Sequence, residues 1–307
     1  MAEKILIQRM GALGDVIMTT PVVRRLRFVL GKDAIIHVRT LHAGVFRNNP
    51  FINGVNVEPP EGGYTRDISL ELAYERRPTM HAVDAFMMEV FADCNWPAKE
   101  MTLHQEAFEL SQPADMKRFV CFHAGVNTKS RSLSREFWLE VIEGILALGL
   151  TPVLIGAGGD HRFPDIPGLV DYHSALNIHQ IAYLIGQSAC FISADTGISH
   201  IAGTTQTPMI SVYTMARGAY RMPYRNGRLG HDIALLEPDL SCIGCFRTMW
   251  NLHNCERGDF ACVNQNAVTS EQVLNQVRTI CSDTWAHVDT IENLRMRDAW
   301  WQIERGV

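Results

Sequence analysis

Residues 190–203 read CFISADTGISHIAG and join an apolar run, a polar turn and a run of small residues. The apolar run predicts a buried strand, and the small residues after it predict a closely packed helix. Ligands of open α/β sheets bind at the carboxyl ends of the strands, which is where Asp195-Thr196-Gly197 lies. The backbone and hydroxyl donors of Thr196 and Gly197 suit a phosphate, whereas Asp195 suits sugar hydroxyls. An ordinary helix cap at Asp195 explains the turn equally well.

The same alternation of short apolar runs with helical spacing extends along the chain and predicts an α/β fold with parallel sheets. The expected strands are residues 4–8, 34–38, 54–57, 119–123, 151–155, 190–194 and 209–213. The expected helices follow residue 15 and span residues 81–92, 136–148, 178–185 and 284–303. Pro21 should kink or split the first of these helices.

Polar residues 111–117 lack any period and are interpreted as a linker. Because the α/β pattern restarts after them, we expect two Rossmann-like domains that face each other across a cleft. The predicted domains are residues 1–112 and residues 113–283, with a helix in 284–307 packing back on the first. Three tryptophans of that last segment could contact a membrane surface, but packing between the domains is the favoured interpretation: Trp285, Trp300 and Trp301.

Composition restricts the class of protein. The chain has 307 residues, of which 47% are hydrophobic, and a formal net charge of −5, so nucleic acid is not an expected partner. No apolar run approaches the ~18 residues of a membrane span, and the N-terminus has no signal-peptide pattern. We therefore expect a cytoplasmic protein in which disulfides are rare.

Two loops after predicted strands carry further candidate ligand-binding residues. Lys129 follows the strand at residues 119–123 and is the first candidate for neutralising a diphosphate, with Arg131 second. A solvated loop charge is the alternative for both. The glycine-rich turn at 156–159 precedes Asp160, which is predicted to accept hydrogen bonds from ribose hydroxyls.

Four of the eight cysteines are clustered in an irregular loop, residues 240–264. Their spacing, a Cys-x2-Cys pair followed by two more, suits a tetrahedral structural Zn²⁺ or iron site, with His253 as a substitute ligand. Such a site has no open position for chemistry. Free reduced thiols or two disulfides are the alternatives. The four predicted ligands are Cys242, Cys245, Cys255 and Cys262.

Taken together, the motifs resemble glycosyltransferase family 9, the ADP-heptose:lipopolysaccharide heptosyltransferases and their relatives. The resemblance rests on ILIQRMGALGDVIMTTPVVRRLR, NNPFINGV, HAVDAFMMEVF, ISADTGISHIAG and the cysteine-bearing segment, in the family's order. It implies a GT-B fold, with the acceptor bound by the N-terminal domain and the nucleotide sugar by the C-terminal domain. It also implies transfer with inversion and without a catalytic metal.

The resemblance also implies roles for individual residues. Asp15 corresponds to the family's general base, although a helix N-cap is its alternative. Lys129 corresponds to the phosphate-binding lysine. The donor-binding motif corresponds to Asp195, Thr196, Gly197 and His200.

One departure concerns the acceptor. Only some twenty-odd residues separate the Asn-Pro segment from the helix at 81–92, where the family usually has more strand and helix. The acceptor (a glycan, a lipid-linked glycan or a protein) and the donor (ADP-heptose or another nucleoside-diphosphate sugar) therefore stay open. The alternatives to a transferase are a sugar-nucleotide epimerase or hydrolase, and a non-catalytic binding module.

Overall fold

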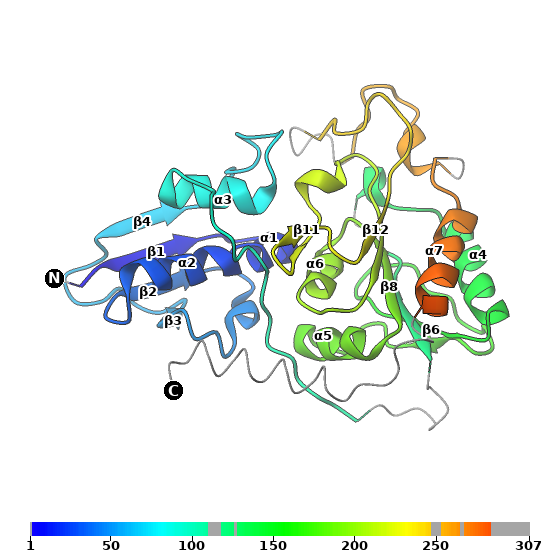
Figure 1. Cartoon of the computed structure of the whole chain (residues 1–307), viewed down its shortest axis with the longest axis horizontal. Coiled ribbons are helices and arrows are strands. Elements are labelled where there is room, and N and C mark those ends of the chain that lie inside the picture. The colour runs from blue at the N-terminus through cyan, green and yellow to red at the C-terminus, as the bar shows by residue number, and fades with distance from the viewer. Residues whose placement is uncertain (1, 110–117, 126–127, 247–252, 265–266, 284–307) are drawn as a thin grey trace.

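A computed structural model describes residues 2–109, 118–125, 128–246, 253–264 and 267–283. The predicted linker at 111–117 and the predicted helix at 284–303, with its tryptophans, lie outside these ranges. The described chain forms two lobes, each built on a parallel sheet, with the N-terminal lobe in blue and cyan and the C-terminal lobe in green to orange (Figure 1).

The N-terminal sheet has four parallel strands in the order β3-β2-β1-β4. The predicted strand at residues 4–8 is confirmed, and the other two predictions are confirmed with small shifts at their ends. The fourth strand was not predicted, because RDIS is short, polar at three of its four residues and largely exposed at the sheet edge. The strands are β1 (Lys4–Gln8), β2 (Ile35–Arg39), β3 (Gly54–Val55) and β4 (Arg66–Ser69).

Pro21 splits the first predicted helix, as expected. A short helix, α1 (Leu13–Ile17), ends before α2 (Thr20–Leu30), and Pro21 stands in the first turn of α2, where its missing N–H has no helical partner to lose. The predicted helix at 81–92 is α3 (Ala82–Phe91), which His81 caps by accepting the Val83 N–H at 3.2 Å.

The C-terminal sheet has six parallel strands in the order β12-β9-β8-β5-β6-β7. All four strands predicted in this half are present, those at 119–123 and 190–194 with the predicted ends. The strands are β5 (Phe119–His123), β6 (Thr151–Leu154), β7 (Val170–Asp171), β8 (Cys190–Ala194), β9 (Met209–Val212) and β12 (Ile233–Leu236).

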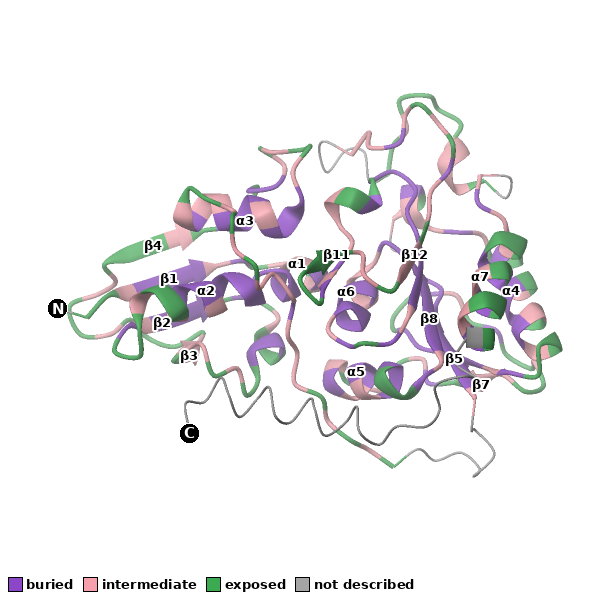
Figure 2. Cartoon of the chain, in the orientation of Figure 1, coloured by how far each residue is buried: buried purple, intermediate pink, exposed green. Residues whose placement is uncertain are grey.

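Helices bury both faces of this sheet, which explains why its strands are continuously apolar (Figure 2). Val120 and Phe122 of β5 pack with α4 (Arg135–Ala147) and α7 (Ser270–Asp283), and Cys121 lies in the core on the other face. That second core contains α5 (Ile178–Gln187) and α6 (Gly197–Gly203). The helix α7 was not predicted, although its apolar residues recur at three- and four-residue steps.

Shorter elements complete the described chain. No helix among the described residues is long and apolar enough to cross a membrane. The short elements are η1 (Ala43–Phe46), η2 (Lys129–Arg131), η3 (Gly218–Tyr220), η5 (Ala261–Val263) and a hairpin of β10 (Tyr224–Arg225) and β11 (Arg228–Leu229).

Each sheet has one point where the chain reverses its direction of strand addition. In the first sheet this point lies between β1 and β4, and in the second between β5 and β8. At such a point the loops that leave neighbouring strands diverge and open a crevice. The two crevices receive the Asp15 turn and the Asp195-Thr196-Gly197 turn, so the fold itself brings the two predicted motifs to comparable positions.

Candidate functional site

A pocket of about 700 Å³ lies between the two lobes at both crevices, a volume typical of small-ligand sites. The N-terminal lobe contributes the Asp15 turn and the segment after β4. The C-terminal lobe contributes the Asp195 turn, the loop after β5 and the loop after β9. The charged and histidine side chains that line the pocket are Arg9, Asp15, Glu71, Glu75, Arg131, Asp195, His200, Arg221 and His253.

On the N-terminal wall, Asp15 stands in the first turn of α1 at the mouth of the pocket. Its Oδ2 atom accepts hydrogen bonds from the Arg9 guanidinium and from the Tyr74 hydroxyl, the latter at 3.1 Å. Arg9 is buried and also bonds the carboxylate of Glu71 at 3.1 Å and the Leu70 carbonyl at 3.2 Å. Both of these bonds to Asp15 use the Oδ2 atom, and they orient the carboxylate at the pocket.

The two predicted motifs touch each other across the lobes. A Cβ added to Gly14 would lie 2.4 Å from Cδ2 of His200, and one added to Gly197 would lie 3.4 Å from Cβ of Leu13. Glycine is therefore required at 14 because the His200 ring packs against that backbone. Helices α1 and α6 therefore pack against each other at the pocket.

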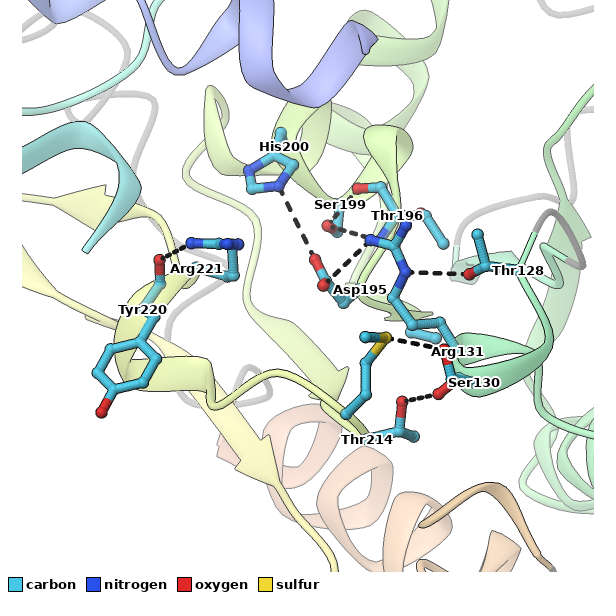
Figure 3. Close-up of polar contacts among 12 residues, drawn as sticks. Thr128, Ser130, Arg131, Asp195, Thr196, Ser199, His200, Thr214, Tyr220 and Arg221 are labelled. Carbon is cyan, nitrogen blue, oxygen red and sulfur yellow. Dashed lines mark hydrogen bonds and ion pairs between the residues drawn. The ribbon is translucent and has the colours of Figure 1, made fainter. Parts of the chain in front are cut away.

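Asp195 lines the pocket with a buried carboxylate. This carboxylate lies between the side chains of Arg131 and His200 (Figure 3). Its Oδ2 atom is 3.3 Å from Nη1 of Arg131, and its Oδ1 atom is 4.0 Å from Nε2 of His200. Burial by itself raises the pKa of Asp195, but the charges of Arg131 and His200 outweigh it and hold the pKa below its ordinary value. Burial is also the largest influence on His200 and lowers its pKa, against the raising effect of the Asp195 and Asp15 charges.

Arg221 is a second cation of this wall, in the loop after β9. Its guanidinium carbon lies 4.2 Å from the centre of the Tyr74 ring, and Tyr74 in turn donates to Asp15. Among the residues that the structure describes, no carboxylate forms an ion pair with Arg221. Its positive charge is therefore available to a ligand in the pocket, close to Asp15.

Two predicted ligand-binding residues are placed away from the pocket. Lys129 is exposed in η2, with its ammonium 4.2 Å from the centre of the Phe260 ring, whereas Arg131, two residues later, lines the pocket. Both residues belong to the 3-10 helix η2, and their side chains leave it in different directions. Asp160 is buried, and its carboxylate lies 3.0 Å from Nε2 of His123 rather than at a surface that a ribose could reach.

The four clustered cysteines are half-buried free thiols. Burial raises the pKa of Cys262 to about 11, with further increases from the other three thiols, so the four are close enough to interact. Burial raises the pKa of Cys255 as well, but hydrogen bonds from backbone N–H groups of Phe260, Arg257 and Gly258 outweigh it and lower that pKa. Within the described ranges, no three His, Cys, Asp or Glu side chains are already arranged around a metal position.

Several residues of the pocket were not predicted from the sequence, among them Arg9, Tyr74 and Arg221. Arg9 directly follows β1, so its place at a carboxyl strand end was a usable signal. Tyr74 and Arg221 lie in loops without any periodic pattern. They come together only because the two lobes pack against each other.

Comparison with models of protein families found a match. The model of glycosyltransferase family 9 (heptosyltransferase) matches residues 82–237, just over half of the chain. A search of curated proteins found no match.

Solved structures with the same fold cover most of the chain. A family 9 glycosyltransferase of Veillonella parvula aligns with a TM-score of 0.70 at 16% identity, over 92% of this chain and 98% of that one. TibC, an iron-containing heptosyltransferase solved with ADP-D-beta-D-heptose, aligns with a TM-score of 0.73 at 14% identity, over 92% and 76%. The E. coli ADP-heptose lipopolysaccharide heptosyltransferase II aligns at 0.64 and 13%, over 92% and 99%. The fold is therefore the two-lobed GT-B arrangement, as the sequence predicted.

Proposed function

Since the chain belongs to glycosyltransferase family 9, we propose that it transfers a sugar from a nucleoside-diphosphate donor to an acceptor hydroxyl, with inversion. The observation that carries this proposal is the pocket between the lobes, which sets the Asp15 carboxylate against the Arg131 and Arg221 guanidinium groups. A carboxylate opposite two cations matches a reaction in which one substrate loses a proton and the other releases an anion. An ADP-heptose is the first donor to test, because TibC was solved with one.

In the proposed reaction, Asp15 accepts the proton of the acceptor hydroxyl as its oxygen attacks the anomeric carbon. The bond from that carbon to the phosphate oxygen breaks, and the nucleoside diphosphate leaves with the electron pair. Arg131 and Arg221 stabilise the charge that develops on the leaving group. Asp195 accepts hydrogen bonds from sugar hydroxyls, because Arg131 keeps it ionised.

In this proposal, side chains rather than a helix dipole stabilise the leaving group. Helix α6 has seven residues, so its dipole adds little to the binding of an anion at Thr196 and Gly197. Two guanidinium groups can supply the required positive charge without a catalytic metal ion. On the acceptor side, Asp15, Glu71 and Glu75 make the wall acidic apart from Arg9, which favours an acceptor that presents hydroxyls rather than phosphates.

A thermal-shift screen against ADP-, GDP- and UDP-sugars tests the donor site. A donor that binds only the folded protein adds about 2.7 kcal/mol of stability at about 100 times its Kd, so Tm should rise clearly for one nucleotide series. ADP should shift Tm more than AMP, because the second phosphate reaches the cations. No shift with any nucleoside diphosphate, or equal shifts with AMP and ADP, would count against the proposed site.

We also propose that the four clustered cysteines bind one structural Zn²⁺ or iron ion. Such an ion requires sulfur ligands. The four thiols interact with one another, and the Cys255 sulfur accepts hydrogen bonds from backbone N–H groups. The thiols would have to draw together around it, because the described residues hold no preformed three-ligand group.

Metal analysis of the purified protein tests this proposal. We expect about one metal ion per chain, loss of that metal in Cys242→Ser/Cys245→Ser, and a lowered Tm in that variant. The matched control is Cys94→Ser, a half-buried thiol of the N-terminal lobe that should leave the metal content unchanged. Absence of stoichiometric metal from the unmutated protein would refute the site.

A further inference from the structure

Behind the pocket, three side chains form a continuous chain of hydrogen bonds. His123 ends β5, and its Nε2 atom lies 3.0 Å from Oδ2 of Asp160. Its Nδ1 atom lies 3.0 Å from Oγ1 of Thr196, which lines the pocket. The side chains of His123 and Asp160 are 3% and 4% exposed, so Thr196 is the member of the chain that a ligand can reach.

The backbone passes close to the imidazole and to the Asp160 carboxylate at two glycines. A Cβ on Gly125 would lie 2.6 Å from Cε1 of His123, and one on Gly156 would lie 2.9 Å from Oδ2 of Asp160. The Ala157 N–H also donates to this Asp160 oxygen at 3.0 Å. The ring is therefore held in one orientation, with each nitrogen facing one oxygen.

The proton positions follow from the partners. An ionised carboxylate only accepts hydrogen bonds, so Nε2 of His123 carries a proton and donates it to Asp160. If the ring is neutral, Nδ1 has no proton and must accept the single hydroxyl hydrogen of Thr196. If the ring is charged, Nδ1 donates to Thr196, whose hydroxyl hydrogen is then free to bond an anion in the pocket.

We propose that binding of the donor diphosphate at Thr196 is coupled to uptake of one proton by His123, which makes the Asp160–His123 pair a proton-dependent positioning device for Thr196. This inference rests on the proposed donor site. A phosphate oxygen has no hydrogen to give, so it needs the Thr196 hydroxyl to donate, and only the charged ring releases that hydrogen. Thr196 contacts the ligand, and His123 acts through it.

Other charges near this chain are already engaged. Asp195, adjacent to Thr196, is paired with Arg131 at 3.3 Å. His161, adjacent to Asp160, is directed at the Leu133 carbonyl at 3.3 Å. Asp160 is therefore the charge in contact with the imidazole, and it stabilises the imidazolium that the diphosphate requires.

The sign of the pH dependence follows from linkage. Because the bound state holds one more proton than the free state, affinity weakens as the pH rises, by up to about tenfold per pH unit. A purely structural His–Asp pair would give no such dependence.

Calorimetry on the full chain tests the coupling, with ADP-2-deoxy-2-fluoro-heptose as the probe. Its diphosphate is esterified at both ends and does not titrate near neutrality, so a proton taken up comes to the protein. Titrations at one pH in Pipes, Hepes and Tris give the number of protons from the dependence on buffer ionisation enthalpy. We expect uptake approaching one proton in the wild type, and an affinity that falls as the pH is raised.

The His123→Asn variant should bind the probe without proton uptake and with a flat pH profile, because its amide N–H replaces the Nδ1 donor permanently. His42→Asn, at a half-exposed histidine of the N-terminal lobe, is the matched control and should keep the uptake. Should His123→Asn fail to fold, Thr196→Val should bind more weakly and also lose the uptake.

Three results would overturn the proposal or its premise. Binding to the wild type without proton uptake would refute the coupling alone. Uptake that persists in His123→Asn, or that is lost in His200→Asn instead, would assign the proton to another group. Failure of the wild type to bind any nucleoside diphosphate would refute the donor site itself and this inference with it.

Discussion

Replacing Asp15 with Asn is expected to lower acceptor-dependent release of the nucleoside diphosphate by about 10²–10⁴-fold, the usual contribution of a general base. Asn keeps the size of the side chain and can still accept from Arg9 and Tyr74, but it cannot take a proton. The affinity for the donor should change by only a few-fold, because the cations that hold the diphosphate stand on the opposite wall. Donor turnover with and without acceptor, and calorimetry with ADP, measure the two effects separately.

Asp33→Asn is the matched control, since Asp33 is an exposed aspartate of the same lobe outside the pocket. Its turnover should equal that of the wild type. Turnover of Asp15→Asn within about threefold of the wild type would contradict the assignment of the base. Strong nucleotide binding by a wild type that turns over no donor with any glycan, lipid-linked glycan or protein acceptor would favour a binding module instead.

Arg131→Ala should lower donor turnover by about 10²–10³-fold, the range found when a group that stabilises transition-state charge is removed. Arg131 faces the pocket and is the cation in contact with Asp195. Its loss removes the positive charge that stabilises the leaving group, and it also leaves the buried Asp195 carboxylate without its cation. Arg131→Lys, which keeps the charge but loses the fork of donors, should lie between Ala and the wild type.

Lys129→Ala is the discriminating comparison. The sequence favoured Lys129 as the phosphate ligand, whereas the structure puts its ammonium over the Phe260 ring. Kinetics of the two alanine variants, with Tm measured for both, should show Lys129→Ala near the wild type and Arg131→Ala strongly impaired. The reverse order would assign phosphate binding to Lys129 and would show that η2 rearranges when the donor binds.

The elements that sequence predicted best are those whose evidence is local. Strands such as β5 and β8 are short apolar runs buried on both faces, and the helix split at Pro21 follows from the missing N–H of that residue. The edge strand β4 escaped prediction because its polar residues carry no period, and pairing with β1 alone makes it a strand. The GT-B fold was also predicted, because five motifs in order identify a family even when each is weak.

The candidate site divides in the same way. The sequence by itself determined the two turns, Asp15 after the first strand and Asp195-Thr196-Gly197 after β8, because a polar turn at a carboxyl strand end is readable from local pattern. Only the tertiary structure decided that Gly14 packs on His200, that Arg131 rather than Lys129 lines the pocket, and that Asp160 supports His123. The physical reason is that a side chain's direction depends on which lobe, sheet or turn packs against it, and those neighbours are distant in sequence.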